Sequence, residues 1–464
     1  MTEYNHLITQ QRNFFNTNAT LPISFRIEQL KKLKQLIETN QTEIAAALKM
    51  DLQKPTIEAF FSEIIFSIEE INYTLRKLKK WARKIKVRTP FPLLWPGRSE
   101  IHYDPYGCVL IITPWNYPFM LLISPLIGAI SAGNCVLVKP SEMATHTQNL
   151  MIKLFKEYFP AEYISAIAAD QLQTTELLKE KFDYIFFTGS SNVGKTIMQA
   201  AAKHLTPVTL ELGGKSPCII DQTADFDFAA RRIIWAKTIN AGQVCVAPDF
   251  VYVHESCKEL LVKKLQKVIT QFFTTEPEKS SSYGRIINNQ HFNRLTHFLQ
   301  KGRILAGGHT KAEDRYISPT LIDNVTWEDD IMQEEIFGPI LPILTYSNID
   351  EVITQLKPRA KPLALYLFTK NVDIEKKILT QLSFGGGCIN DCIMQIVNPH
   401  LPFGGVDQSG MNQYHGQYSF ETFSHRKSIY KKRILLDFKL EYPPYTNEKL
   451  KWLKKLARLS FRWS

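Results

Sequence analysis

The sequence predicts an α/β protein with doubly wound parallel sheets, and two observations point to this fold. Short apolar runs such as CVLIIT (108–113) and CVLVK (135–139) alternate with segments of helical periodicity. Strands of a parallel sheet are buried on both faces, so they read as continuous hydrophobic runs rather than alternating ones. The same rhythm begins again with CIID (218–221), which predicts a second α/β domain after Glu211.

The first hundred residues are predicted to be mainly helical. Residues 22–50 carry leucine and isoleucine at spacings of three and four, and residues 56–85 are again apolar on one face. Each segment is therefore predicted to form one amphipathic helix. A proline-rich break follows at 89–97, and residues 99–107 alternate in the manner of a strand before a turn.

The later elements follow the α/β rhythm. The first half is predicted to contain strands at 108–113, 135–139, 163–169 and 184–189, with helices at 118–132 and 145–158. The second half is predicted to contain strands at 218–221, 250–254 and 362–369, with helices at 225–239 and 256–273. A last helix is predicted at 448–463, with Trp452, Leu456, Leu459 and Trp463 on one stripe.

One uncharged stretch resembles a membrane span. No charged residue lies between Asp104 and Lys139, and residues 119–138 have about the length that crosses a bilayer. Prolines and asparagines interrupt this stretch, and it ends in a strand-like VLVK. We interpret it as strand, loop, buried helix and strand, with a membrane span as the alternative.

The net charge of +11 is concentrated in the last residues. Residues 426–464 contain 12 Lys or Arg and 3 Asp or Glu, so the rest of the chain is close to neutral. A nearly neutral body argues against nucleic-acid binding. The basic end is typical of a segment that meets an acidic surface or anionic lipid.

The cysteines indicate reduced thiols rather than a metal or disulfide framework. Seven cysteines are dispersed, and only Cys388 and Cys392 are close together, in CINDC, which has neither a zinc nor a redox spacing. We predict no metal site and a cytoplasmic setting. The polar start MTEYNHLITQQRN gives no sign of a secretory signal.

Two segments each hold one side chain suited to chemistry. Glu211 lies in LELGGKSP (210–217) before two glycines, and Cys245 lies in NAGQVCVAP (240–248) between two valines. A thiolate can attack a carbonyl carbon, and a carboxylate can take a proton from water. The alternative is an inert core cysteine, since free Cys commonly packs as a small apolar residue, and a surface glutamate.

The segment GSSNVGKT (189–196) allows two interpretations. It matches the phosphate-loop pattern G-x4-G-K-[ST] between a predicted strand and a predicted helix, which alone predicts a nucleoside triphosphatase. A glycine at a helix N-terminus can equally hold the pyrophosphate of a dinucleotide. Only the dinucleotide gives Cys245 and Glu211 a role, because a thiol adduct needs a hydride acceptor.

Seven segments, taken together and in order, resemble the aldehyde dehydrogenase superfamily over nearly the whole chain. They are TPWNYPF (113–119), VLVKPSE (136–142), FTGSSNVGK (187–195), LELGGKSP (210–217), NAGQVCVAPD (240–249), EEIFGP (334–339) and HLPFGGV…SGM…YHG (400–416). The runs NAGQVCVAPD and YHGQYSFETFSHRKS are similar to the class 3 branch. That branch includes fatty-aldehyde, aromatic-aldehyde and apocarotenal dehydrogenases.

The resemblance implies three structural parts and a tail. A Rossmann-like dinucleotide-binding domain would comprise residues 1–86 and 108–210, and an α/β catalytic domain residues 211–395. A small β-rich bridging element that pairs two subunits would comprise 87–107 and 396–442. Residues 443–464 would form a basic amphipathic C-terminal tail.

The resemblance also implies the roles of single residues. Cys245 would be the nucleophile, Asn116 with the Cys245 backbone N–H would stabilise the oxyanion, and Glu211 would activate the deacylating water. Residues around NAD or NADP would be Thr113, Pro114, Trp115, Lys139, Glu142, Gly189, Ser190, Gly194, Leu212, Gly213, Glu335 and Phe337. The apolar substrate pocket would be lined by Tyr117, Val244, Ile393 and Phe403.

The function implied is NAD(P)-dependent oxidation of a long-chain or bulky apolar aldehyde to its carboxylic acid, through a thiohemiacetal and a thioester on Cys245. The protein would be a cytoplasmic homodimer, with the tail at 448–463 either contacting a membrane surface or covering a pocket. Rival hypotheses are the triphosphatase, a dinucleotide-binding scaffold without activity, and an enzyme that uses an acyl thioester.

The sequence departs from the family at three positions. Asp407 and Asn412 stand where the family usually has glycine, and Val244 stands where threonine is common in this branch. Aspartate and asparagine tolerate a left-handed backbone better than other side chains, so we expect the turns at 407 and 412 to survive.

Overall fold

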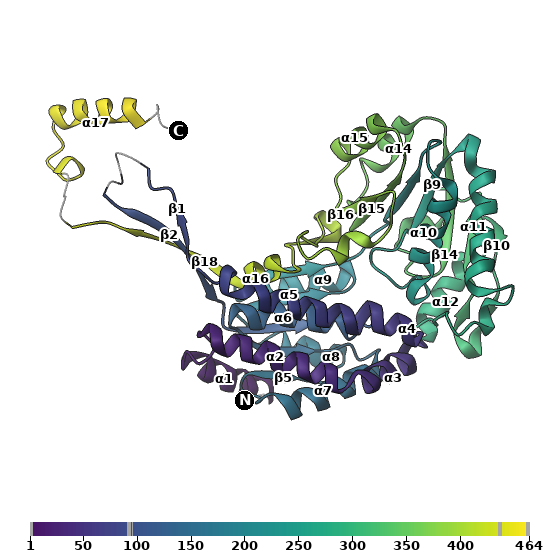
Figure 1. The fold of residues 1–464 in the computed structure, drawn as a ribbon, viewed down its shortest axis with the longest axis horizontal. Coiled ribbons are helices and arrows are strands. Elements are labelled where there is room, and N and C mark those ends of the chain that lie inside the picture. Colours follow the sequence, from purple (N-terminus) through teal and green to yellow (C-terminus); the bar gives the residue numbers. More distant parts are fainter. Residues whose placement is uncertain (1–2, 91–93, 95, 435–438, 461–464) are drawn as a thin grey trace.

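The computed structural model describes residues 3–90, 94, 96–434 and 439–460, which form two large sheets and a smaller one (Figure 1). The six-stranded sheet has the order β17-β7-β6-β3-β4-β5 and is parallel except for β17. Its strands are β3 (Cys108–Ile112), β4 (Cys135–Lys139), β5 (Ile164–Ala166), β6 (Tyr184–Thr188), β7 (Val208–Glu211) and β17 (Gly410–Met411).

The seven-stranded sheet has the order β10-β13-β14-β9-β8-β15-β16 and is parallel except at β10. Its strands are β8 (Pro217–Ile220), β9 (Phe250–His254), β10 (Arg303–Ala306), β13 (Thr320–Asp323), β14 (Ile340–Tyr346), β15 (Ala364–Phe368) and β16 (Gly386–Ile389). The α/β prediction is therefore confirmed, with parallel strands in both large sheets. A short pair, β11 (Thr310–Lys311) and β12 (Tyr316–Ile317), lies outside them.

Helices cover the two large sheets. Those associated with the six-stranded sheet are α1 (Glu3–Asn16), α2 (Ile23–Thr39), α3 (Gln41–Leu52), α4 (Thr56–Ala59), α5 (Ile65–Trp81), α6 (Met120–Ala132), α7 (Thr145–Tyr158), α8 (Gln171–Leu177), α9 (Ser191–Ala202) and α16 (Gln417–Thr422). Those associated with the other sheet are α10 (Phe226–Thr238), α11 (Lys258–Phe273), α12 (Asn289–Phe298), α13 (Asp330–Gln333), α14 (Ile349–Leu356) and α15 (Val372–Gln381).

The uncharged stretch forms core rather than a membrane span. Residues 119–138 contain α6, which is buried on every side, and the buried strand β4. A helix that is apolar all round belongs inside a large core, and α6 packs among α2, α5 and α16. Within the described ranges, no helix has both the length and the apolar character to cross a bilayer.

Two predicted helices are wrong in their bounds. The segment 22–50 is divided at Asn40, whose side chain donates to Leu36 O at 2.7 Å and so closes α2 before α3 begins. The segment 56–85 contains α4, a π-helical turn at Phe60–Ile64 and α5, which ends at Trp81. Polar residues that bond to nearby carbonyls compete with the regular helix, a local effect that hydrophobic spacing does not report.

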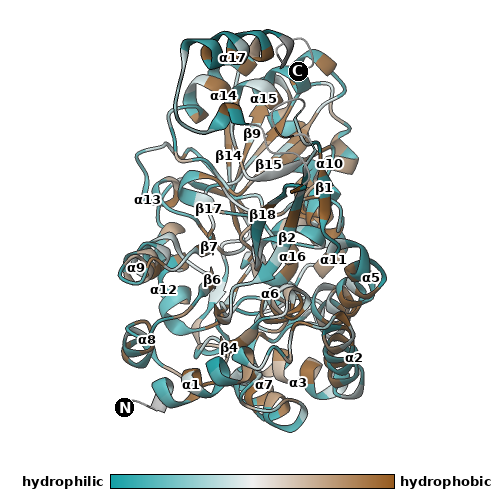
Figure 2. Cartoon of the chain, turned by 90° about the vertical axis from the view of Figure 1, so that its left-hand side faces the viewer, coloured by the Kyte–Doolittle hydropathy of each residue, from teal (hydrophilic) through white to brown (hydrophobic). Residues whose placement is uncertain are grey.

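The third sheet forms an arm away from both large sheets (Figure 1). It is antiparallel, with β2 (Arg98–Pro105) between β1 (Ile85–Val87) and β18 (Ser424–Lys431). Beyond the arm lies α17 (Asn447–Ser460), which Figure 2 shows as largely hydrophilic. In the predicted stripe, Trp452 is exposed and Leu456 is half-buried, whereas the Leu459 side chain and Trp463 lie outside the described residues. The predicted division into domains stays a prediction.

Candidate active site

Cys245 lies in a tightly turned loop between α10 and β9. Asn240, Ala241 and Gly242, at the start of this loop, all have left-handed backbone, with φ of 50°, 52° and 76°. A Cβ at Gly242 would come within 2.4 Å of Gly338 O, so only glycine fits there. Such a run of left-handed residues is costly and persists only where surrounding contacts enforce it. The loop is therefore held by its neighbours.

Asn116 is one of those neighbours. Its side-chain amide donates to Gln243 O at 3.0 Å, and its carbonyl accepts from Asn240 Nδ2 at 2.8 Å. Gln243 in turn donates to Arg285 O at 3.0 Å. The turn that carries Asn116 and the loop that carries Cys245 are thus bonded together in both directions. A primary amide has two N–H groups, so the bond to Gln243 leaves Asn116 a second donor for the predicted oxyanion.

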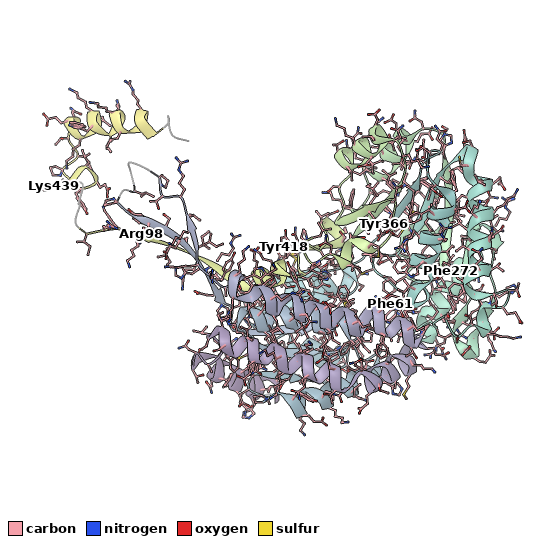
Figure 3. All side chains as sticks on the ribbon, in the orientation of Figure 1. Phe61, Arg98, Phe272, Tyr366, Tyr418 and Lys439 are labelled. Atoms are coloured by element: carbon pink, nitrogen blue, oxygen red, sulfur yellow. The ribbon has the colours of Figure 1, made fainter. Side chains whose placement is uncertain are left out.

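Cys245 and Glu211 line one cavity of about 360 Å³. The four residues predicted for the substrate pocket line the same cavity; they are Tyr117, Val244, Ile393 and Phe403. Phe61 lies at the cavity, between the N-terminal helices and the seven-stranded sheet (Figure 3). Further apolar lining residues that the sequence did not predict include Phe66, Met120, Leu121, Trp235, Met394 and Val397.

Glu211 ends β7 and is 2% exposed. Among the described residues neither of its carboxylate oxygens has a hydrogen-bond partner. Burial without a partner disfavours the charged form and raises the pKa of Glu211 well above its ordinary value. A carboxylate with a raised pKa is a stronger base towards water than an exposed one, which suits the predicted deacylation.

Burial raises the pKa of the Cys245 thiol to about 12, and the nearby carboxylates of Glu335 and Glu211 add to the rise. The backbone N–H groups of Cys245 and Val246 act in the opposite direction, because they bond to the sulfur. In this structure the sulfur therefore carries its proton at neutral pH, and attack requires that the proton leave. The predicted thiolate is a reacting state rather than the resting one.

The residues predicted for the pyrophosphate gather at the start of α9. Ser190 caps this helix, with its Oγ accepting from Val193 N at 3.4 Å. A Cβ at Gly194 would come within 2.8 Å of the Leu212 side chain, so the glycine lets α9 lie close to that residue. Helix N-termini present backbone N–H groups to anions.

The residues predicted for the nucleosides lie at the carboxyl ends of neighbouring strands. Lys139 ends β4 and forms an ion pair with Glu142. Thr113, just after β3, has a buried hydroxyl for which the described residues supply no partner. Its neighbour Trp115 packs its ring 5.3 Å from that of Phe337. Ligands of open parallel sheets bind at these strand ends.

Glu335 lies against the glycines that follow Glu211. A Cβ at Gly213 would come within 2.0 Å of Glu335 Oε2. Burial and the charge of Asp249 raise the pKa of Glu335 to about 8, although Gly214 and Lys215 oppose the rise. A cleft of about 710 Å³ is lined by Ser191, Gly213, Gly214, Lys215 and Glu335, among others. The start of α9 and the Glu335 carboxylate at this cleft fit the pyrophosphate and a ribose hydroxyl of a dinucleotide.

The geometry does not support the phosphate-loop interpretation of residues 189–196. Helix α9 begins at Ser191, so Gly194 and Lys195 lie within the helix instead of in a loop before it. Lys195 is exposed, and the Thr196 hydroxyl donates to Asn192 O at 3.3 Å. A phosphate loop needs its backbone N–H groups free to cradle the phosphates, whereas Gly194 N already donates to Ser190 O at 2.9 Å.

Left-handed backbone also occurs at Asp407, Asn412 and Ile393, among other described positions. Asp407 and Asn412 have φ of 59° and 68°, as expected for positions at which the family uses glycine, and Asn412 donates to Val208 O at 2.7 Å. Ile393 has φ of 67°, which is an outlier for a β-branched residue. It lines the cavity beside Cys245, and nothing in its sequence context predicts this backbone.

Comparisons with known proteins show the family of this chain. The sequence profile of the Aldehyde dehydrogenase family matches residues 1–429. A 4,4'-diaponeurosporen-aldehyde dehydrogenase of Staphylococcus aureus is 48% identical over 443 residues, which cover 95% of this chain and 96% of the relative. A dimeric, NADP-preferring aldehyde dehydrogenase of Canis lupus familiaris is 43% identical over 446 residues, covering 96% and 98%.

A solved structure, described as the substrate-bound state of Staphylococcus aureus AldH, superimposes with a TM-score of 0.96. Its sequence is 47% identical, and the alignment covers 98% of this chain and 100% of that chain. The profile match extends over most of the chain, and both relatives align over nearly all of it. The chain therefore belongs to the aldehyde dehydrogenase family and is an oxidoreductase of aldehydes.

Proposed function

We propose that the protein oxidises long-chain or bulky apolar aldehydes, such as fatty aldehydes or apocarotenals, to carboxylic acids with NAD or NADP. The observation that carries this proposal is the shared cavity, in which Cys245 and Glu211 are the reactive groups within a largely apolar wall. The relative from Staphylococcus aureus is named for a polyene aldehyde, which supports a bulky apolar substrate.

Cys245 first releases its proton to solvent water, and the thiolate then adds to the aldehyde carbon in the cavity that it lines with Glu211. The second N–H of Asn116 and the Cys245 backbone N–H then receive the oxyanion. Preorganised donors of this kind contribute several kcal/mol, because they stabilise charge that develops in the transition state.

When bound, NAD or NADP supplies the hydride acceptor. The α9 N-terminus would bind its pyrophosphate, and Glu335 the ribose near Gly213. The acyl group remains on Cys245 as a thioester. Glu211 then takes a proton from water, and the hydroxide released attacks the thioester and frees the acid. The apolar wall limits the water that reaches the sulfur before this step.

A spectrophotometric assay tests the reaction. The wild-type protein is mixed with NAD or NADP and a panel of aldehydes, and absorbance at 340 nm is followed. We expect turnover that is abolished in Cys245→Ala, and retained turnover in that variant would refute the proposal. The value of kcat/KM should rise from butanal to decanal, because burial of each added methylene contributes about 0.8 kcal/mol of binding free energy.

We also propose a homodimer that is paired through the arm, with α17 acting outside its own subunit. All residues that line the cavity lie between Phe61 and His415 in the sequence. The described part of the tail therefore does not cover the cavity of its own chain. Its basic, exposed side chains favour an anionic lipid surface or the partner's cavity entrance. Deleting residues 446–464 should lower cosedimentation with anionic vesicles, or change KM for decanal if the tail is a lid.

A further inference from the structure

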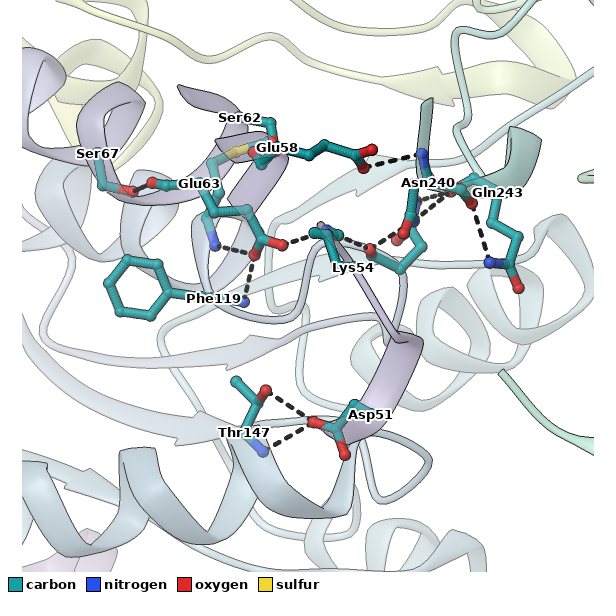
Figure 4. Close-up of polar contacts among 12 residues, drawn as sticks. Asp51, Lys54, Glu58, Ser62, Glu63, Ser67, Phe119, Thr147, Asn240 and Gln243 are labelled. Carbon is teal, nitrogen blue, oxygen red and sulfur yellow. Dashed lines mark hydrogen bonds and ion pairs between the residues drawn. The ribbon is translucent and has the colours of Figure 1, made fainter. Parts of the chain in front are cut away.

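A fully buried ion pair between Lys54 and Glu63 contacts the turn that carries Asn116 (Figure 4). Lys54 and Glu63 are both 0% exposed, and Lys54 Nζ contacts Glu63 Oε1. The same ammonium donates to Asn116 O at 3.3 Å and lies 4.0 Å from the centroid of the Tyr117 ring. A single cation is therefore in contact with the predicted oxyanion residue and with a residue of the substrate cavity.

Glu63 fixes the other end of this turn. Its second oxygen accepts from Phe119 N at 3.0 Å and Met120 N at 3.1 Å, where α6 begins. A carboxylate at a helix N-terminus satisfies N–H groups that have no partner within the helix and interacts favourably with the helix dipole. The ion pair thus holds the turn between residues 116 and 120 from both sides.

Glu58 extends the network to the loop of Cys245. Its Oε1 accepts from Asn240 N at 2.8 Å, at the start of that loop. Glu58 and Glu63 are five residues apart, a spacing at which an α-helix directs side chains to different faces. The π-helical turn Phe60–Ile64 winds more widely, with i→i+5 bonding, and Glu63 contacts Lys54 while Glu58 contacts Asn240 (Figure 4). Such turns occur often at functional sites.

Stability does not explain the pair. Removing two charges from water is costly, and buried ion pairs can often be replaced by apolar side chains without loss of stability. What an apolar pair cannot do is donate to Asn116 O. The structural consequence specific to Lys54 is the placement of Asn116, whose carbonyl it shares with Asn240.

We propose that Lys54, anchored by Glu63, is a positioning residue for aldehyde oxidation. It fixes the backbone of Asn116, so that one amide N–H bonds Gln243 O and the other faces the oxyanion beside Cys245. The inference rests on the proposed role of Asn116. Lys54 touches neither substrate nor cofactor; it acts through the turn and the loop.

The first test is Lys54→Met with decanal and NAD or NADP. We expect kcat to fall at least tenfold, while KM for each substrate changes less than threefold. The matched control is Arg26→Met. Arg26 is another buried cation of the same helical layer, and it bonds to Ser131 O at the far end of α6. Equal losses of kcat in both variants would overturn the proposal.

A double-mutant cycle links Lys54 to its target. If Lys54 acts through Asn116, adding Lys54→Met to Asn116→Ala should lower kcat less than twofold further. Independent, multiplicative losses would overturn the proposed route. Should Lys54→Met fail to fold, Lys54→Met/Glu63→Gln removes both charges and keeps an oxygen for the start of α6; the same loss of kcat is expected in this variant.

Amide hydrogen exchange separates this inference from the proposed function, because it needs no turnover. Peptides covering 113–119 and 239–246 should exchange at least tenfold faster in Lys54→Met, or in the double variant, than in Arg26→Met. If the wild-type protein oxidises no aldehyde, the proposed function fails, but this result still decides whether Lys54 positions the two segments. Unchanged exchange in both peptides would overturn the inference.

Discussion

Glu211 and Glu63 are both buried acids within the same molecule, yet their surroundings are opposite. Both oxygens of Glu63 have partners, which are the Lys54 ammonium and two backbone N–H groups at the start of α6. Neither oxygen of Glu211 has a partner among the described residues, and its pKa is raised well above the ordinary value. One region uses a buried charge to hold structure, and the other keeps a buried carboxyl available for a proton.

This difference shows that the burial of an acid does not by itself reveal its role. A buried polar group without a partner costs about 1–3 kcal/mol, so it persists where chemistry requires it. A buried acid whose bonds are all made contributes to order and geometry instead. The comparison predicts that substituting Glu211 affects rate far more than stability, and that substituting Glu63 affects both.

The largest effect is expected for Glu211→Gln. Loss of the general base should lower the steady-state rate by about 10²- to 10⁴-fold, whereas a first-turnover burst of NAD(P)H should remain because acylation precedes hydrolysis. Stopped-flow absorbance at 340 nm measures both phases. The thermal midpoint should not fall, since the variant removes an unpartnered carboxyl. A lost burst with an unchanged steady-state rate would contradict the assigned role.

The second effect concerns Glu63→Gln. Breaking one side of a buried ion pair leaves the Lys54 ammonium without its counter-charge, and we expect the free energy of unfolding to fall by about 3–5 kcal/mol. Urea denaturation followed by fluorescence measures this change. The matched comparison is Glu211→Gln, for which no loss is expected. Similar destabilisation by both substitutions would remove the distinction between the two regions.

Sequence reasoning found one of these acids and missed the other for a physical reason. Glu211 lies in a short segment next to glycines, which marks a close approach of the backbone. Glu63 lies in a helix that also carries Glu58 and Glu70, and such acids usually face solvent. Their burial is produced by α6 and the Cys245 loop, which are distant in sequence. A π-helical turn leaves no mark on hydrophobic spacing.

The strands likewise divide into those that the sequence predicted and those that it missed. Strands β3, β4 and β6 were predicted because their sequences are nearly continuous apolar runs, and all their residues are buried. β18 was not predicted, since its sequence SHRKSIYK has no apolar face and is exposed except at Ser424. It becomes a strand by pairing with β2 over its full length. Local patterns therefore predicted these three buried strands and missed one that depends on pairing between distant segments.

A third test uses Glu70, a buried acid with fewer partners than Glu63. Burial raises the pKa of Glu70 to about 7, and a bond from Ser124 opposes the rise. A pKa raised on folding gives stability that is complete below the unfolded pKa of about 4.5 and is lost as pH rises through 7. The contribution is at most about 3 kcal/mol. Glu70→Gln should flatten the dependence of unfolding free energy between pH 4.5 and 7, measured by urea denaturation.

The smallest effect concerns the charge around Cys245. After burial, the Glu335 carboxylate is the main influence that raises the pKa of this thiol, so Glu335→Gln should lower that pKa and increase the thiolate fraction. Because the pKa of Glu335 is itself about 8, the effect should grow as pH rises from 7 to 9, where the carboxylate is charged. Peptide-resolved alkylation of Cys245 by iodoacetamide should become about threefold faster at pH 9, since a tenfold change corresponds to one pKa unit. The exposed neighbour in Glu334→Gln is the control and should leave the rate unchanged. Equal alkylation rates in the two variants would show that the Glu335 carboxylate does not control the pKa of Cys245 through its charge. The contrast between Glu211 and Glu63 would then concern proton transfer alone.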